Sequence, residues 1–229
     1  LLVRVPFTRK LSLYSPENFV REVLHNYGIR EMHVGSNFRF GHERSGNIHT
    51  LQALGEALGF EIYEISPVTF RGQRISSTAI RKALSRGQVA FAKRLLGRPY
   101  QMLGTVVRGA GRGVGLGFPT ANLNPENELI PATGVYVTRT HLDGQSFASV
   151  TNVGFRPTVE VNAPPSPVVE THILDTDRDV YGKSMGLDFC FRLRGEKEFS
   201  GVEALSQQIR IDVEQARTYL DRLKKLGRE

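Results

Sequence analysis

The first third of the chain alternates between strand-like and helical spacing of its apolar residues. Two short segments read as strands, namely EMHVG (31–35) and FEIYEIS (60–66). Three segments carry helical spacing or a helix-start signal: 15–26, 47–58 and 75–84. Strands that alternate with helices predict an α/β layer with a parallel sheet. Two strands are too few to stand alone, so we expect this part of the chain to expose apolar sheet surface.

From about residue 97 the helical spacing disappears and short β-rich runs take its place. Five runs lie between turn signals: 100–107, 134–140, 146–153, 168–174 and 186–193. Such strands predict a small antiparallel barrel or sandwich. The chain closes with apolar residues three or four apart from Leu205 to Leu223, which predicts a long helix. Ser200 and Glu203 fit a capping box at its start, and Gly227 fits its end.

Charge separates the same two segments. The net charge is +7, and residues 1–96 hold 14 Lys and Arg against 7 Glu, whereas residues 97–229 hold 16 basic against 16 acidic residues. A basic first unit faces an anionic partner such as a polyphosphate, a nucleic acid or a membrane surface. The alternative is an acidic segment, outside this sequence, that balances the charge.

Cysteine usage and hydropathy indicate the compartment. Cys190 is the single cysteine, which excludes an internal disulfide framework and fits a reducing environment. No apolar run approaches the roughly 20 residues that a membrane-spanning helix needs. We therefore expect a cytoplasmic protein without a membrane partner.

Two glycine-rich stretches lie between the first two β-rich runs. In GLGFPTAN (115–122), Thr120 and Asn122 stand two residues apart, so both side chains point the same way on an extended chain. A neutral pair of oxygen ligands beside glycine backbone suits a hard cation that arrives with phosphate. The preceding RGAGRG (108–113) offers backbone N–H groups that could wrap phosphates, and a glycine hairpin is its simpler interpretation.

Polar residues in two other segments each allow two interpretations. Glu170 interrupts an apolar strand, so it lies on an open edge or acts as a base, and the edge is the simpler choice. The hydroxyl-rich start of ISSTAIR (75–81) either binds phosphate together with Arg81 or is an N-cap followed by a surface arginine.

Together these motifs resemble the bifunctional bacterial riboflavin kinase/FMN adenylyltransferase family, also called FAD synthetase. LLGRPY, GxGRG, LGFPTAN, NVGFRPT, ETHILD and FRLRGEKEF occur in the family's order. The resemblance divides the chain into residues 1–96, the later part of a Rossmann-like nucleotidyltransferase domain, and residues 97–229, a riboflavin kinase domain. For the second it implies a six-stranded antiparallel β-barrel with a C-terminal helix.

The resemblance also implies roles in transferring phosphate from ATP to riboflavin to give FMN. Glu170 would be the base, and Thr120 and Asn122 would bind Mg²⁺ and the nucleotide phosphates. The remaining ATP contacts would be Gly109, Gly111 and Tyr181. The flavin contacts would be Arg194, Lys197 and Phe199.

Residues 1–96 resemble the adenylyltransferase part through VGSNFRFG and ISSTAIR. The implied site residues there are Asn37, Ser76, Ser77, Thr78 and Arg81. Asn37 departs from the family pattern, which usually has Asp at this position. The family's HxGH nucleotide-binding motif occurs nowhere in the 229 residues. We therefore expect this chain to make FMN but not FAD, although its parent protein does both.

Two other functions compete with this interpretation. The first is a kinase-only protein with a structural N-terminal segment. The upstream coding sequence would distinguish it, because a bifunctional protein has the HxGH motif there and a kinase-only protein does not. A basic barrel that binds nucleic acid would draw on the +7 charge, but that charge lies outside the barrel segment and no aromatic–basic stacking pattern accompanies it. We therefore expect no nucleic-acid partner.

Overall fold

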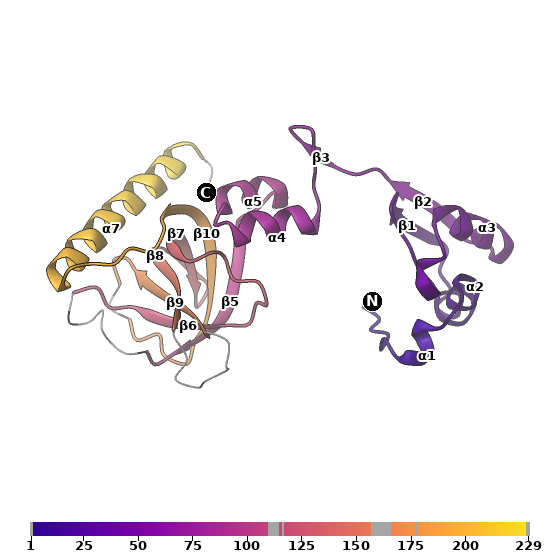
Figure 1. The fold of residues 1–229 in the computed structure, drawn as a ribbon, viewed down its shortest axis with the longest axis horizontal. Coiled ribbons are helices and arrows are strands. Elements are labelled where there is room, and N and C mark those ends of the chain that lie inside the picture. The colour runs from indigo at the N-terminus through magenta and orange to yellow at the C-terminus, as the bar shows by residue number, and fades with distance from the viewer. Residues whose placement is uncertain (1, 110–114, 116, 157–165, 177, 228–229) are drawn as a thin grey trace. The chain divides into compact units, whose positions relative to one another are not determined.

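The computed structural model describes residues 2–109, 115, 117–156, 166–176 and 178–227. Their contacts divide the chain into two compact units, Leu1–Ile75 and Ser76–Glu229. Figure 1 shows the elements of each unit, which we describe separately.

Unit 1 contains the α/β layer predicted from the sequence. Strands β1 (Glu31–Gly35) and β2 (Glu61–Ile65) pair in parallel, with Glu31 opposite Glu61. The helical elements are α1 (Arg9–Ser12), α2 (Pro16–Phe19), a π-helix (Val20–Leu24), 3-10 turns (His25–Tyr27 and His42–Arg44) and α3 (Ile48–Leu58). A short hairpin, β3 (Thr69–Phe70) and β4 (Gln73–Arg74), ends the unit.

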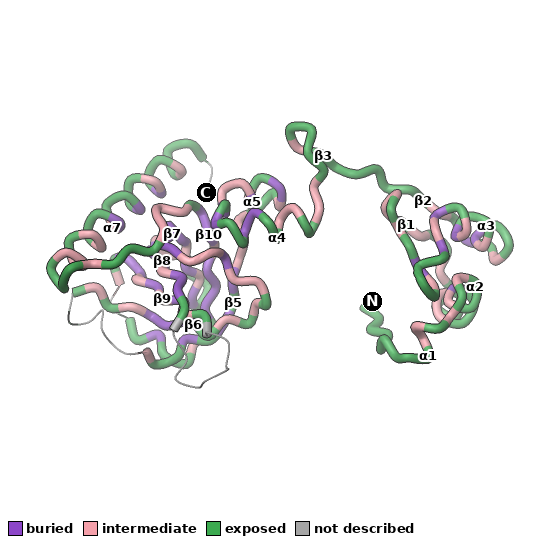
Figure 2. The backbone as a smooth tube through the Cα atoms, in the orientation of Figure 1, coloured by how far each residue is buried: buried purple, intermediate pink, exposed green. Residues whose placement is uncertain are grey.

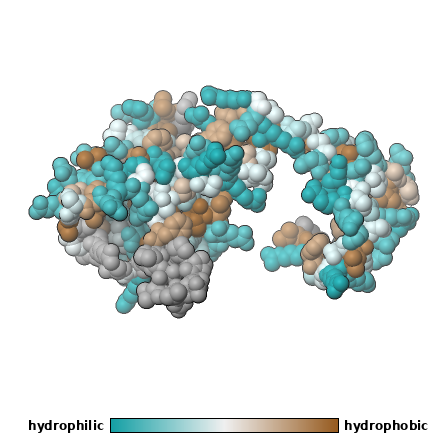
Figure 3. Space-filling model, viewed as in Figure 1, coloured by the Kyte–Doolittle hydropathy of each residue, from teal (hydrophilic) through white to brown (hydrophobic). Residues whose placement is uncertain are grey.

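The core of unit 1 is small, and its sheet exposes apolar side chains as predicted. The buried residues are Val20, Val34, Phe40, Ile48, Leu51 and Phe60. Tyr63 and Ile65 on β2 remain about half exposed, and β1 buries only Val34. Exposed apolar side chains also occur near the N-terminus, on the face of this unit that Figure 3 shows.

Unit 2 is a closed six-stranded antiparallel barrel, which confirms the fold implied by the family resemblance. Its strands follow one another around the barrel in the order β10-β5-β6-β9-β8-β7. Their bounds are β5 (Tyr100–Val107), β6 (Ala121–Pro125), β7 (Gly134–Leu142), β8 (Gln145–Arg156), β9 (Ser166–Ile173) and β10 (Ser184–Arg194).

Two helices precede the barrel and share its core. Helices α4 (Ser77–Ser85) and α5 (Val89–Leu96) contribute Leu84 and Ala92 to the cluster that fills the barrel. By their contacts both helices therefore belong to unit 2. Figure 2 shows buried residues on the barrel strands and on these two helices. The boundary between residues 96 and 97 stays a prediction about the two family domains.

The C-terminal helix α7 (Val202–Lys225) covers part of the barrel's outer face. Its Ala216 and Leu220 pack on Val135, Val137 and Val150. The capping box predicted from Ser200 and Glu203 is wrong. Gly201 occupies the N-cap without a side-chain hydrogen bond, so Glu203 stands at the second helical position, one residue too early to close the box. Gly227 adopts a left-handed conformation just past the helix, as predicted.

Candidate active site

The barrel register aligns three polar side chains across neighbouring strands. Glu170 on β9 lies opposite Asn122 on β6 and opposite Asn152 on β8. The residues on either side of Glu170, Val169 and Thr171, are fully buried in the barrel, so Glu170 points to the outer face. Directly opposed residues place their Cβ atoms about 4.5–5.5 Å apart on the same face. The three side chains therefore form one row.

The open-edge interpretation of Glu170 is wrong. Strand β9 pairs with β8 over residues 166–173 and with β6 over residues 169–171, so Glu170 has a paired strand on both sides, and the barrel is closed. Closure removes sheet edges, so the position of Glu170 cannot be explained by an unpaired strand. Glu170 is a partly exposed carboxylate on the outer wall, in register between two amide side chains.

The backbone at Gly109 lies directly against Asn122. A Cβ built on Gly109 would stand 2.1 Å from Nδ2 of Asn122 and 2.6 Å from its Oδ1. No side chain fits in that space, so the chain needs glycine there for close approach. Gly111, predicted to lie in the same loop, is outside the described residues.

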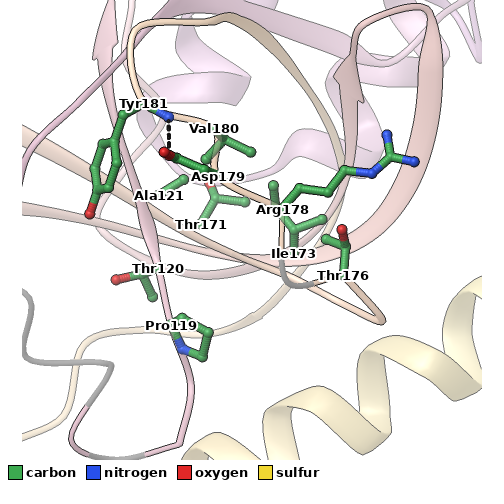
Figure 4. A pocket seen from close by; sticks show the side chains of 10 residues that line it. All are labelled: Pro119, Thr120, Ala121, Thr171, Ile173, Thr176, Arg178, Asp179, Val180 and Tyr181. Atoms are coloured by element: carbon green, nitrogen blue, oxygen red, sulfur yellow. Dashed lines mark hydrogen bonds between the residues drawn. The ribbon is translucent and has the colours of Figure 1, made fainter.

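Thr120 lies just before β6 and lines a pocket together with Tyr181 (Figure 4). The pocket is also lined by Pro119, Ala121, Thr171, Ile173, Thr176, Arg178, Asp179 and Val180. The guanidinium of Arg108 lies 6.0 Å from the ring centroid of Tyr181, which brings the start of the glycine-rich loop beside this pocket. The backbone N–H of Tyr181 donates to Oδ1 of Asp179, which fixes the turn that carries the ring.

A second contact fixes the approach to β6. Nδ1 of His172 lies 2.8 Å from the carbonyl oxygen of Pro119, and the His172 ring meets Phe118 edge-on. His172 is two residues beyond Glu170 on the same face of β9. The strand that carries the candidate base therefore also holds the segment that carries Thr120.

The residues present fit a magnesium ion. Thr120 and Asn122 supply neutral oxygens two residues apart, and glycine backbone lies close to Asn122. Mg²⁺ binds proteins through few ligands and keeps water and phosphate oxygens in its shell. Within the part of the chain that the structure describes, no group of three His, Cys, Asp or Glu side chains could hold a metal.

The predicted flavin contacts differ in their surroundings. Arg194 donates from Nε and Nη2 to Asp212 of α7 at 2.8–3.1 Å and lies over the ring of Phe199 at 5.6 Å. Lys197 is exposed and lies in the chain between Arg194 and Phe199, on the segment that leads from β10 to α7. Arg194 is therefore engaged in anchoring α7 to β10, and the segment that carries Lys197 and Phe199 starts from this anchor.

The residues predicted for adenylylation fall in both units. Oδ1 of Asn37 accepts a hydrogen bond from Arg74 at 3.0 Å, within unit 1. The Ser76 hydroxyl accepts from the backbone N–H of Ala79 at 3.2 Å, which confirms the N-cap interpretation. Ser77, Thr78 and Arg81 follow in the first turns of α4. Whether these residues bind a nucleotide stays a prediction.

Sequence reasoning missed two polar residues, one in the row and one near it. Asn152 is the β8 neighbour of Glu170. The Glu196 carboxylate reaches over Gly154, where a Cβ would meet its Oε1 at 2.8 Å. Both residues lie in motifs that carried the resemblance, NVGFRPT and FRLRGEKEF, but only the strand register shows that Asn152 borders Glu170, and only the packing around Gly154 brings Glu196 near Asn152.

Family models of known proteins match both parts of the chain. The riboflavin kinase family model matches residues 96–220, and the FAD synthetase family model matches residues 1–79. No helix among the described residues is long and apolar enough to cross a membrane.

Curated relatives match almost the whole chain. A bifunctional riboflavin kinase/FMN adenylyltransferase from Haemophilus influenzae is 33% identical over 96% of this chain and 71% of its own length. One from Pseudomonas fluorescens is 37% identical over 92% of this chain and 68% of its own length. A crystal structure described as a macrolide-efflux protein from Streptococcus pneumoniae has a TM-score of 0.84 and 28% identity, covering 92% of this chain and 67% of that one. By its sequence matches along both units, this chain belongs to the bifunctional riboflavin kinase/FMN adenylyltransferase family.

Proposed function

We propose that this chain transfers the γ-phosphate of ATP to the ribityl 5′-hydroxyl of riboflavin, giving FMN and ADP. The observation that carries the proposal is the pairing of Glu170 with Asn122 across β9 and β6, in the domain that matches the riboflavin kinase model. A carboxylate beside a neutral oxygen ligand supplies the two parts that phosphoryl transfer needs, a base for the nucleophile and a position for the phosphates.

Glu170 is the proposed general base. Its carboxylate accepts the proton of the 5′-hydroxyl as the hydroxyl oxygen bonds to the γ-phosphorus. The bond from that phosphorus to the β–γ bridging oxygen breaks, and ADP leaves with the electron pair. General-base catalysis by a positioned side chain contributes about 10²–10⁴-fold to the rate.

Thr120 and Asn122 are the proposed ligands of Mg²⁺. ATP would bind as its complex with this ion. When bound, the ion neutralises phosphate charge. Backbone at Gly109 and Gly111 would line the phosphates, and Tyr181 would lie beside the nucleotide. The closeness of Gly109 to Asn122 and of Arg108 to Tyr181 supports this arrangement.

Lys197 and Phe199 are the proposed contacts of the flavin. Arg194 holds their segment through Asp212, so we assign it a positioning part in flavin binding. ATP, riboflavin and FMN are the substrates and product that the family implies. A cytoplasmic location and the lack of a nucleic-acid partner remain parts of the proposal.

Adenylylation of FMN to FAD is the second candidate function. The match of residues 1–79 to the FAD synthetase model favours it. Asn37, Ser76, Ser77, Thr78 and Arg81 would be its site residues.

One reaction tests both functions. The chain is incubated with riboflavin, ATP and Mg²⁺, and the flavins are separated by chromatography. FMN without FAD supports the kinase alone, and FAD in addition would contradict the expectation from the absent HxGH motif. Folded protein that makes no FMN would refute the kinase, and salt-dependent binding of nucleic acid by that protein would favour the binding function.

A further inference from the structure

Asn152 lies beside Glu170 on β8, and the proposed function gives it no contact with ATP, Mg²⁺ or riboflavin. In the row across the outer wall, Glu170 has Asn122 on one side and Asn152 on the other. Asn122 is assigned to the metal and phosphates, and its side chain is buried against Gly109. Asn152 is only partly buried, so its amide can turn toward Glu170.

A base that takes a proton during phosphoryl transfer must hold its carboxylate in one orientation. A glutamate side chain has several rotatable bonds, and misplacement by about 1 Å can cost 10²-fold in rate. An amide N–H on the adjacent strand restricts that freedom, because cross-strand neighbours lie within reach of a side-chain hydrogen bond. Catalytic hydrogen bonds often shorten only when substrate is bound.

A second carboxylate lies near Asn152, over Gly154 two residues further along β8. A Cβ built on Gly154 would stand 2.8 Å from Oε1 of Glu196 and 3.8 Å from Nδ2 of Asn152. The amide nitrogen of Asn152 and the carboxylate of Glu196 thus approach the same space. An asparagine amide has two N–H donors, so Asn152 can donate to each of the two carboxylates and reduce the repulsion between their like charges.

We propose that Asn152 is a positioning residue that holds the carboxylate of Glu170 toward the riboflavin hydroxyl in the substrate complex. The inference rests on the proposed kinase function. Asn152 touches neither ATP nor the reacting hydroxyl and acts only through Glu170. Its loss therefore lowers kcat and leaves KM for ATP and for riboflavin unchanged.

A double-mutant cycle tests this role. Asn152→Ala is made in the wild type and in Glu170→Gln, and kcat and both KM values are measured from FMN formation. We expect kcat to fall about tenfold in the wild type and less than twofold in Glu170→Gln, because coupled residues are not additive. The matched control is Asn124→Ala, an exposed asparagine on the same strand as Asn122, whose register partner is Thr105 on β5. It should leave kcat unchanged.

Two conservative variants separate hydrogen bonding from packing. Asn152→Ser keeps one donor and should retain part of the rate. Asn152→Asp keeps the shape but loses both donors and adds a negative charge, so it should be at least as slow as Asn152→Ala. Because both variants are small polar changes on a partly exposed wall, they also serve if the alanine variant does not fold.

Three results would overturn the inference. Equal loss of kcat in both backgrounds means that Asn152 acts independently of Glu170. A rise in KM for riboflavin with normal kcat means that Asn152 contacts the flavin. Full activity of Asn152→Asp means that the amide donors are not used. Wild-type protein that makes no FMN overturns the kinase function itself, which is a distinct result.

Discussion

Replacing Asp212 by alanine should loosen helix α7 from the barrel. Asp212 is almost fully buried and accepts from Nε and Nη2 of Arg194 and from the side chain of Gln208. The Arg194 side chain is only 16% exposed. In Asp212→Ala the guanidinium keeps its hydrogen bond to the carbonyl oxygen of Gly195 but loses its counter-charge.

The size of the effect follows from these contacts. Removing one partner of a buried ion pair costs about 3–5 kcal/mol, and the remaining exposure and the Gly195 contact favour the lower end. Alanine in place of aspartate returns about 0.5 kcal/mol of helix propensity. The net loss is therefore about 2.5 kcal/mol, which corresponds to roughly 70-fold more frequent opening of the helix at 1.36 kcal/mol per tenfold.

Hydrogen exchange measured by mass spectrometry on peptides from residues 202–225 reports this local opening directly. The matched control is Asp221→Ala, because Asp221 is an exposed aspartate on the same helix. Arg194→Met combined with Asp212→Ala removes the buried guanidinium that Asp212→Ala leaves without its counter-charge. The double variant should recover at least half of the lost helix stability. Unchanged exchange in Asp212→Ala, or a double variant that exchanges as fast as the single one, would refute the reasoning.

Three further predictions concern the site and the pH dependence of α7. Glu170→Gln should lower kcat roughly 10²-fold or more with riboflavin still bound, and near wild-type turnover would remove Glu170 from the base role. Gly109→Ala forces a methyl group into the neighbouring amide and should raise KM for ATP at least tenfold, whereas Gly201→Ala, which meets nothing within 4 Å, should not. Arg217 lowers the pKa of Asp175, so their pair contributes stability above the ordinary aspartate pKa that is lost as pH falls through the lowered value. An NMR titration should show the Asp175 pKa rising in Arg217→Gln, and an unchanged value would contradict the pairing.

The sequence predicted where the strands lie better than it predicted which strands pair with one another. Alternation located five of the six barrel strands, and only β6 was not recognised from its pattern. Its five residues, ANLNP, include two asparagines and a proline, which are poor strand signals. Pairing with β5 and β9 holds this segment as a strand, and a single sequence does not display such pairing.

The two interpretations that failed depended on information beyond local pattern. Glu170 was assigned to an edge because alternation cannot tell which strands flank β9. The capping box at Ser200 and Glu203 matched the motif's spacing, but the helix begins at Val202, one residue beyond the position that the motif requires. In contrast, the N-cap at Ser76 depends only on adjacent residues and was correct.

The closed barrel and its strand register account for the position of Glu170 among neutral polar residues. Because side chains alternate between the two faces of a strand, slipping β9 by one residue would turn Glu170 into the core and bring Thr171 outward. Inside the barrel, the hydroxyl oxygens of Thr171 and Thr151 are hydrogen-bonded at 2.9 Å. The Thr151 hydroxyl is also hydrogen-bonded to that of Thr138 at 2.7 Å. These buried hydroxyls can pair only in the observed register, since a buried polar group without a partner is costly. The polar interior therefore fixes the register that sets Glu170 between Asn122 and Asn152, and in the proposed kinase the nucleotide would bring the charge that the neutral residues Thr120 and Asn122 lack.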